Sequence, residues 1–296
     1  MPVVLPTIAA ALREAAQRGL ERIDAQLLLL HALGQAQRSR AWLIAHDEQT
    51  LTPAQQTAFA HLLAQRQRGV PVAYLTGRKG FFGLELAITP DVLDPRPDTE
   101  TLVEWALQTL APRTNPSVWD LGTGSGAIAL AIKSQRPDAR VWASDQSASA
   151  LAVARQNGQA LGLQVHWLQG SWFDAAADDG QSSVQSSVQS PPLPGAGQWD
   201  VLVSNPPYIA AADPHLPALA HEPRQALVSG ADGLADIRAI ARAAPTWLTP
   251  GGWLLLEHGW DQASAVAAIL AQAGLRHISH RCDLAGHARC TGGMRE

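Results

Sequence analysis

Hydrophobic positions follow a helical period from Thr7 to about Arg68, in a stretch rich in Ala, Leu and Gln. Glycines at positions 19, 34 and 69 interrupt the pattern, and glycine is typical of helix ends. A helix start is indicated at Thr52, because threonine is a good N-cap, Pro53 fits the first turn and Gln55 holds the capping-box position. We therefore predict a small helical domain over residues 1–70.

The pattern changes after this helical stretch. Between Val72 and Ile88, aromatic residues and glycines are arranged in the manner of two strands and a turn, and we predict a β-hairpin connector over residues 71–90. A helix is predicted from about Glu100 to Leu110, after a proline-rich segment. The domain boundary is placed near residue 90, with a larger domain over residues 91–296.

Residues from Ser117 onward alternate between short β-type runs and helical runs. In order, the predicted strands and helices are Val118–Asp120, Ala127–Gln135, Arg140–Ser144, Ala148–Leu161, Val165–Gln169, Val201–Ser204, Ile237–Leu248 and Trp253–His258. This alternation predicts an α/β fold of βαβ units on a mostly parallel sheet. Ligands of such sheets bind beyond the carboxyl ends of the strands.

One segment of the larger domain has a different composition. Residues 175–198 are rich in Asp, Gln, Ser, Pro and Gly and contain a short Gln-Ser-Ser-Val repeat. They lack the apolar surface that would offset the entropy of ordering. We predict a flexible, low-complexity insert before a strand.

Composition and charge limit the classes of function. The formal net charge is −4, so no overall positive field would attract the chain to nucleic-acid phosphates. The two cysteines, Cys282 and Cys290, lack the second pair that a zinc site needs, and we expect no metal. The sequence has no secretory signal and no apolar run long enough to span a bilayer, so we expect a cytoplasmic protein that does not bind membranes. It has no heptad repeat, so we expect a monomer.

A glycine-rich turn follows the strand that begins at Val118. It reads Asp120-Leu121-Gly122-Thr123-Gly124-Ser125-Gly126 and opens a helix. Glycines let the backbone turn tightly and approach a bulky ligand. Their spacing is Gly-x-Gly-x-Gly, which differs from the Gly-x-Gly-x-x-Gly of dinucleotide sites, so an NAD-type site is a minor alternative and a turn without a ligand is the other.

An acidic residue accompanies this turn. Asp145 ends the next predicted strand, where its carboxylate is placed to accept hydrogen bonds from two ribose hydroxyls. Asp120 either orients the glycine loop or meets the ammonium group of the ligand. This combination favours S-adenosylmethionine, which has no pyrophosphate for a helix N-terminus to bind.

The segment Asn205-Pro206-Pro207-Tyr208 follows another predicted strand. Two prolines cannot continue a central strand, so the chain leaves the sheet in a rigid turn, which by itself is also the structural alternative. The Asn205 side-chain oxygen and the Pro206 carbonyl can each accept a hydrogen from an NH₂ group, and Tyr208 offers a flat face for stacking. We predict a clamp for a planar amide or amino nitrogen, with no general base, in which catalysis comes from positioning.

These motifs resemble those of the PrmC/HemK family, which methylates N5 of the glutamine in the Gly-Gly-Gln motif of class-1 peptide chain release factors. The more discriminating family-like segments are Tyr74–Gly77, Pro95–Glu100, Ser171–Phe173 and Leu255–Gly259. The resemblance implies a Rossmann-like, seven-stranded class I methyltransferase domain behind a helical domain that helps to dock the release factor, and a hairpin connector. It implies cofactor contacts by Gly122, Thr123, Gly124, Ser125, Gly126, Asp145, Trp172 and Asn205, and a glutamine held by Asn205, Pro206, Pro207 and Tyr208.

Other residues carry two interpretations each. With ten tryptophans in the chain, core packing is the default for Trp172 and an adenine contact is what the resemblance adds. Arg96 and Glu100 either pair structurally or line the peptide cleft, and we favour the cleft. His258 is either a hydrogen-bonded histidine near a strand end or a catalytic base, and we favour the first. The tail after Gly293 is short, which could remove part of the pairing of the last strand.

Two other functions compete with a glutamine methyltransferase. An adenine-N6 or guanine-N2 nucleic-acid methyltransferase would hold an exocyclic NH₂ in the same clamp, with a flipped base stacked on Tyr208. The acidic balance and the lack of an obvious basic recognition segment count against it. A non-catalytic cofactor-binding adaptor is the second alternative, and the intact Asn205 and Tyr208 count against that one.

Overall fold

The computed structural model describes residues 5–176 and 193–296, which form two compact units that meet between Arg78 and Lys79. Most of the insert predicted at 175–198 lies outside the described residues. Ala175, predicted to open that insert, is instead buried in a 3₁₀ helix, Trp172–Ala176 (η2). Within the described ranges, no helix has the length and apolarity to cross a membrane.

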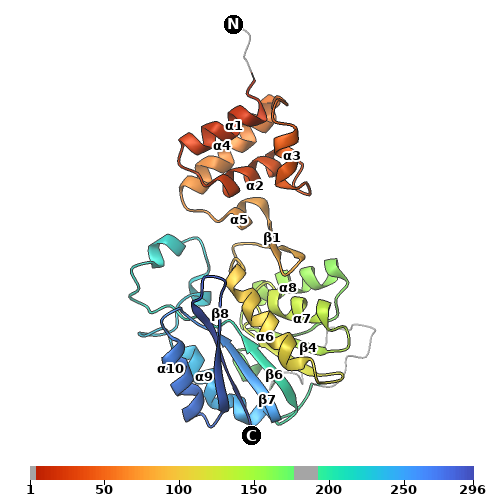
Figure 1. Cartoon of the computed structure of the whole chain (residues 1–296), viewed down its shortest axis with the longest axis vertical. Helices are drawn as coiled ribbons and strands as arrows, with labels where there is room; N and C mark the ends of the chain where they lie inside the picture. Colours follow the sequence, from red (N-terminus) through yellow and green to blue (C-terminus); the bar gives the residue numbers. More distant parts are fainter. Residues whose placement is uncertain (1–4, 177–192) are drawn as a thin grey trace. The chain divides into compact units, whose positions relative to one another are not determined.

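The first unit is helical, as its hydrophobic period predicts (Figure 1). Its helices are α1 (Ile8–Gln17), α2 (Arg22–Ala32), α3 (Arg40–Ala45), α4 (Pro53–Gln67) and α5 (Val72–Thr76). Thr52 and Gln55 form the predicted capping box at the start of α4. The apolar faces of the helices enclose a core that includes Ile8, Leu28 and Phe59.

The hairpin is shorter than the sequence predicts. Its strands, β1 (Arg78–Phe81) and β2 (Leu84–Ala87), pair with each other, whereas Val72–Thr76 forms α5 and not a strand. Pro71 precedes this helix, and Gly77 ends it in the left-handed conformation with φ of 72°. Local capping therefore overrides the β-type composition of this segment.

Seven strands of the described residues form one sheet in the second unit, in the order β5-β4-β3-β6-β7-β9-β8. Their bounds are β3 (Ser117–Leu121), β4 (Arg140–Asp145), β5 (His166–Gln169), β6 (Trp199–Ser204), β7 (Leu248–Glu257), β8 (Arg276–Cys282) and β9 (Ala288–Met294). The first five in this order are parallel, and β9 is antiparallel to β7 and β8. The predicted mostly parallel sheet is confirmed.

Helices cover both faces of this sheet. The helices are α6 (Glu100–Leu110), α7 (Ala127–Gln135), α8 (Ala148–Leu161), α9 (Ala235–Trp247) and α10 (Ala263–Gln272). Figure 1 shows α6, α7 and α8 on one side and α9 and α10 on the other. Strand β3 lies between β4 and β6, so the chain crosses toward β4 and β5 on one side of β3 and toward β6 and β7 on the other. Right-handed crossovers in these opposite directions place their helices on opposite faces of the sheet. The strand order reverses there, which is where ligands bind in such sheets.

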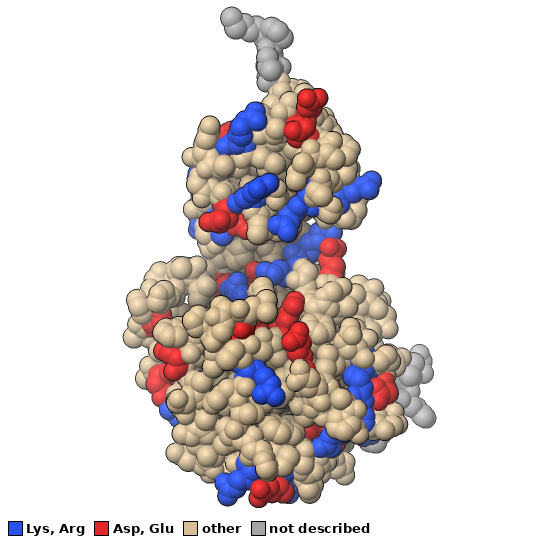
Figure 2. Space-filling model, viewed as in Figure 1, with Lys and Arg blue, Asp and Glu red and all other residues tan. Residues whose placement is uncertain are grey.

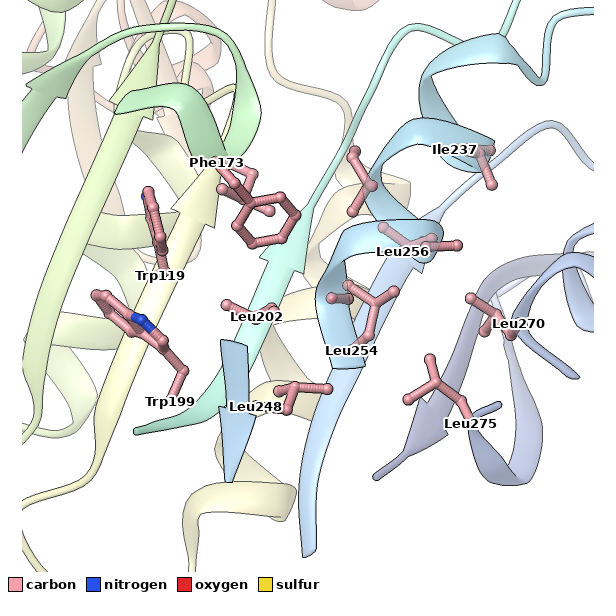
Figure 3. Close-up of a cluster of buried hydrophobic side chains, with 14 of the residues drawn as sticks. Trp119, Phe173, Trp199, Leu202, Ile237, Leu248, Leu254, Leu256, Leu270 and Leu275 are labelled. Carbon is pink, nitrogen blue, oxygen red and sulfur yellow. The ribbon is translucent and has the colours of Figure 1, made fainter. Parts of the chain in front are cut away.

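A cluster of aromatic side chains fills the core under α9 (Figure 3). The rings of Trp119 on β3 and Trp199 on β6 are 4.8 Å apart, and Phe173 meets Trp119 edge-on at 5.5 Å. Aromatic pairs of this kind stabilise a core beyond their buried area. Phe173 thereby anchors η2 against the sheet beside the carboxyl ends of the strands.

The last strand keeps its pairing with both neighbours, although the tail after Gly293 is short. Strand β9 pairs with β7 from Cys290 to Met294 and also pairs with β8. The Arg295 N–H donates to the Gly252 carbonyl. The last strand therefore lies between two partners, where its backbone groups are satisfied.

We expect Asn157→Ala to lower the free energy of unfolding by about 2–3 kcal/mol, because it leaves buried backbone groups without partners. The Asn157 Oδ1 accepts from the Ala87 N–H at 2.7 Å, and its Nδ2 donates to the carbonyls of Ala87 at 3.0 Å and Ser125 at 2.9 Å. Urea unfolding would measure the loss. Gln159→Ala on the exposed side of α8 is the control, and an equal effect of the two changes would contradict the expectation.

Candidate active site

A cavity of about 300 Å³ lies at the carboxyl ends of β3, β4, β5 and β6, the edge where the sequence motifs fall. This volume is at the lower end of the range for small-molecule pockets. Eight of the predicted site residues line it: Gly122, Thr123, Gly124, Ser125, Asp145, Trp172, Asn205 and Pro207. The tertiary structure thus brings segments from four strand ends to one cavity.

The glycine turn is held against the neighbouring strand. The N–H groups of Gly122 and Thr123 both donate to the Ser144 carbonyl, at 2.8 and 2.9 Å. Gly122 has φ of 75°, and a Cβ there would lie 3.1 Å from the Trp172 ring. Glycine is therefore required at this position by both backbone conformation and the close approach of the indole.

Gly126 has a packing role in the fold. It is absent from the cavity lining among the described residues. A Cβ there would lie 3.1 Å from side-chain carbons of Leu130 and Trp167, so the third glycine allows α7 to pack closely on its neighbours. A cofactor contact by Gly126 stays a prediction.

Asp120 orients the glycine loop, which is one of its two predicted roles. Its buried Oδ2 accepts from the Thr123 hydroxyl at 2.6 Å and from the Ala129 N–H at 3.2 Å. Burial raises the pKa of this carboxyl to about 7. Oδ1 has no hydrogen-bond partner in the described part of the chain.

The raised pKa of Asp120 predicts a pH effect on stability. The unfolded chain loses the Asp120 proton near pH 4 and the folded chain near pH 7, so the unfolded state binds fewer protons between these values. The free energy of unfolding from this group therefore falls as pH rises through the window. We expect Asp120→Asn to make that decline shallower in urea unfolding from about pH 4.5 to 7.5, and the exposed Glu104→Gln to leave it unchanged. Equal slopes for wild type and Asp120→Asn would contradict this.

Asp145 ends β4 at the cavity wall. Its Oδ2 accepts from the Gly124 N–H and its Oδ1 from the Ser147 N–H, each at 2.9 Å. Each carboxylate oxygen keeps a further lone pair. Burial raises the pKa of Asp145, while the two backbone hydrogen bonds lower it. The carboxylate is thus held in one orientation with acceptor capacity left toward the cavity.

Trp172 lies both against the core and at the cavity, and its predicted adenine contact stays a prediction. It packs against the aromatic core and lines the cavity. Its φ of 47° is in the left-handed region, where a bulky residue is rare. The neighbouring Phe173, anchored in the core, holds this backbone conformation and leaves the indole edge beside Gly122.

The Asn-Pro-Pro-Tyr segment leaves β6 beside the glycine turn. The Asn205 Nδ2 donates to the Thr99 Oγ1 at 3.3 Å, and its Oδ1 is buried without a hydrogen-bond partner in the described residues. The Tyr208 hydroxyl donates to Glu257 at 3.4 Å, and burial raises the pKa of this phenol. Pro206 and Tyr208 do not line the cavity in the described structure, so their substrate roles stay predictions.

Arg96 and Glu100 make structural contacts. Arg96 forms ion pairs with Asp94 and Glu222, and Glu100 accepts from the Phe82 N–H at 2.9 Å in the hairpin turn. Neither belongs to the described cavity lining. Their contribution to a peptide cleft stays a prediction.

His258 is a hydrogen-bonded histidine, as predicted. It is fully buried, with Nδ1 2.8 Å from the Gly259 carbonyl and Nε2 2.6 Å from the Thr291 hydroxyl. Burial lowers its pKa. Both ring nitrogens are thus engaged by the fold.

Two residues at the site were not singled out by the sequence. Thr99 lines the cavity and contacts Asn205, and Glu257 is buried beneath Tyr208. Both belong to segments that resemble the PrmC/HemK family, which is the signal that could have drawn attention to them. Their relation to Asn205 and Tyr208 depends on which strands are neighbours.

The groups at the cavity match the chemical groups of S-adenosylmethionine. Asp145 offers a carboxylate to ribose hydroxyls, Trp172 offers an aromatic surface, and Gly124 has open space where a Cβ would be. The buried Asn205 Oδ1, which has no partner within residues 5–176 and 193–296, offers an acceptor, and such groups in a native fold call for a ligand or water. The same segment therefore can hold both a cofactor and an NH₂ group.

Comparisons with known proteins cover both units. Residues 4–77 match the PrmC N-terminal domain family, and residues 98–233 match the Methyltransferase small domain family. The release factor glutamine methyltransferase of Bordetella pertussis is 50% identical over 94% of this chain and 96% of its own length. That of Xylella fastidiosa (strain Temecula1) is 47% identical over 96% of each chain.

A solved structure agrees in fold. A 16S rRNA N2 methyltransferase of T. Thermophilus, in complex with AdoMet and guanosine, has a TM-score of 0.51 at 17% identity and covers 74% of this chain and 50% of its own. At this identity the likeness shows the fold alone, which is that of class I methyltransferases. With the full-length similarity of the relatives, we conclude that this chain belongs to the release factor glutamine methyltransferase family of S-adenosylmethionine-dependent enzymes.

Proposed function

We propose that this chain transfers the methyl group of S-adenosylmethionine to N5 of the glutamine in the Gly-Gly-Gln motif of class-1 peptide chain release factors. The observation that carries the proposal is the Asn205 amide, whose Oδ1 is a buried acceptor without a partner in the described residues and which lines the same cavity as Asp145 and Gly124. Relatives that match almost the whole chain are named for this activity.

S-adenosylmethionine, when bound, supplies an electrophilic methyl group. Asp145, Trp172 and the turn from Gly122 to Ser125 would hold it at the cavity wall. The Asn205 Oδ1 and the Pro206 carbonyl would each accept one hydrogen of the glutamine NH₂, because both are acceptors on a rigid turn. As the nitrogen gains positive charge in the transition state, these hydrogen bonds strengthen.

No general base is needed before the transfer in this arrangement, because the methylated nitrogen is cationic and strongly acidic and then releases one of its two protons to water. An amide nitrogen is a weak nucleophile because its lone pair is delocalised, so orientation carries most of the rate, with contributions of up to roughly 7–11 kcal/mol in favourable cases. Tyr208 would stack on the planar amide. Its hydroxyl donates to Glu257, which limits rotation of the ring.

The helical unit is proposed to help to dock the release factor, with residues 1–70 as the docking domain, 71–90 as the connector and 91–296 as the catalytic domain. The partner is a protein, because the net charge is −4 and the face shown in Figure 2 carries both signs of charge among uncharged residues. This distribution does not favour a phosphate backbone. We infer a cytoplasmic monomer, with no direct contact to nucleic acid.

The proposal is tested by transfer of labelled methyl from S-adenosylmethionine to a purified class-1 release factor. The matched control is the same factor with its Gly-Gly-Gln glutamine replaced by alanine. Label on the native factor alone is expected. Equal label on both factors would contradict the assigned nitrogen, and no label on either, with cofactor binding intact, would favour an adenine or guanine amino group as substrate.

A further inference from the structure

A group of polar side chains adjoins the Asn205 amide and Tyr208. The Asn205 Nδ2 is 3.3 Å from the Thr99 Oγ1, and the Tyr208 hydroxyl is 3.4 Å from the Glu257 Oε1. Thr99 is 3% exposed and Glu257 1% exposed, so water has little access to either. These side chains come from the start of α6, the end of β6 and the end of β7.

The Thr99 hydroxyl is near enough to the Glu257 carboxyl to influence its pKa. Burial raises the pKa of Glu257 to about 7, the nearby Asp98 also raises it, and hydrogen bonds from Thr99 and Tyr208 and the charge of Arg289 lower it. The Glu257 Oε2 has no hydrogen-bond partner at ordinary distance in the described residues. A buried carboxylate with spare acceptor capacity is costly, and its neighbours are donors that lead to the proposed clamp.

An asparagine amide has two orientations that differ by exchange of oxygen and NH₂. At pH values above its raised pKa of about 7, the Glu257 carboxylate only accepts hydrogen bonds, so a Thr99 hydroxyl that donates to it presents its own oxygen as an acceptor. The group of Asn205 that meets this oxygen must then be the NH₂. This leaves Oδ1 as the acceptor without a partner, which is the state of that atom among the residues that the structure describes.

Resting on the proposed function, we propose that Thr99 and Glu257 are positioning residues that set the orientation of the Asn205 amide, so that Oδ1 and not NH₂ faces the substrate nitrogen. In the opposite orientation, the Asn205 NH₂ would point at the NH₂ of the substrate. Two hydrogen-bond donors would then face each other without an acceptor, which disfavours binding. Glu257 also accepts from the Tyr208 hydroxyl, so one carboxylate orients two parts of the clamp.

The activity test compares Thr99→Val, which removes the hydroxyl at nearly constant shape, with Thr99→Ser, which keeps it. With saturating cofactor, we expect Thr99→Val to lower kcat about 10- to 30-fold, KM for the release factor to change by less than about threefold, and Thr99→Ser to stay near wild type. Glu257→Gln should resemble Thr99→Val, and the double variant should lose less than the product of the two effects, because the residues act in one chain. Equal kcat for Thr99→Val and Thr99→Ser would overturn the proposal.

A second readout does not depend on activity. The chain has three asparagines, at positions 115, 157 and 205, so selective ¹⁵Nδ labelling gives three side-chain NH₂ signals. They are assigned with Asn115→Asp and Asn205→Asp. We expect the Asn205 NH₂ to exchange slowly with solvent in wild type and Thr99→Ser, and at least about tenfold faster in Thr99→Val and Glu257→Gln. The exposed Asn115 and the buried Asn157 serve as fast and slow references.

The two readouts separate this proposal from the proposed function. If wild type fails to methylate the release factor but its Asn205 exchange depends on the Thr99 hydroxyl, the proposed substrate is wrong and the orienting role stands. If wild type methylates the factor while Asn205 exchange is the same in Thr99→Val and Thr99→Ser, the orienting role is wrong and the substrate stands.

Discussion

Asn205→Ala is expected to lower kcat for methyl transfer to the release factor by about 100- to 1000-fold, the range seen when one preorganised transition-state hydrogen bond is removed. Asn205 contributes the Oδ1 acceptor that, in our proposal, orients the NH₂ and interacts more strongly as its nitrogen becomes cationic. Single-turnover transfer of labelled methyl, with saturating cofactor and release factor, would measure the chemical step.

The fold should tolerate this substitution. The Asn205 Oδ1 has no partner in the described residues, so its removal relieves a desolvation cost while the Nδ2 bond to Thr99 is lost, and the free energy of unfolding should change by less than about 1 kcal/mol. Gln159→Ala, which removes an exposed amide from α8, is the control and should keep full activity. An Asn205→Ala enzyme with near-normal kcat would show that the clamp mechanism is wrong.

Asp145→Ala is expected to weaken S-adenosylmethionine binding by about 100- to 10,000-fold. A hydrogen bond to a charged group contributes about 1.5–3 kcal/mol, and two such bonds to ribose hydroxyls would be lost together, at about 1.4 kcal/mol for each factor of ten. The glycine turn would also lose the acceptor for its Gly124 N–H. Isothermal titration calorimetry with the intact chain would give the dissociation constant.

The control for this variant is Glu104→Ala, which removes an exposed carboxylate from α6 and should leave cofactor binding unchanged. Asp145→Asn adds a finer comparison, since an amide has a single acceptor oxygen and cannot replace both carboxylate oxygens. It should bind the cofactor more weakly than wild type. Unchanged affinity in Asp145→Ala would place the ribose elsewhere and contradict the assigned cofactor site.

The fold class could be predicted from the sequence because its signals are local. The alternation of strand and helix runs after Ser117 predicted the order of elements from β3 to β7, but not α10, β8 and β9. The capping box at Thr52 predicted the start of α4, which the structure confirms. Where local signals conflicted, the prediction was wrong. Val72–Thr76 has a β-type composition, yet Pro71 precedes it and Gly77 ends it as a helix.

The cavity lining was predictable for a similar reason. In a parallel sheet the carboxyl ends of strands share one edge, so motifs that follow strands, such as Gly122–Ser125 and Asn205, could be assigned to one site from their order alone. The family could be identified because these motifs and the segments around them are contiguous.

Only the tertiary structure decided which distant side chains support that site. Thr99 contacts Asn205, which is 106 positions away in the chain, and Arg96 contacts Glu222, which is 126 positions away. Asn157 bonds to Ala87 of the hairpin, which is 70 positions away. Such pairs depend on strand order and on how helices pack against the sheet, and periodicity along the chain carries no information about either. The sequence by itself therefore determined the fold class, the family and the motifs of this protein, whereas the partners that orient its reactive groups follow from long-range packing.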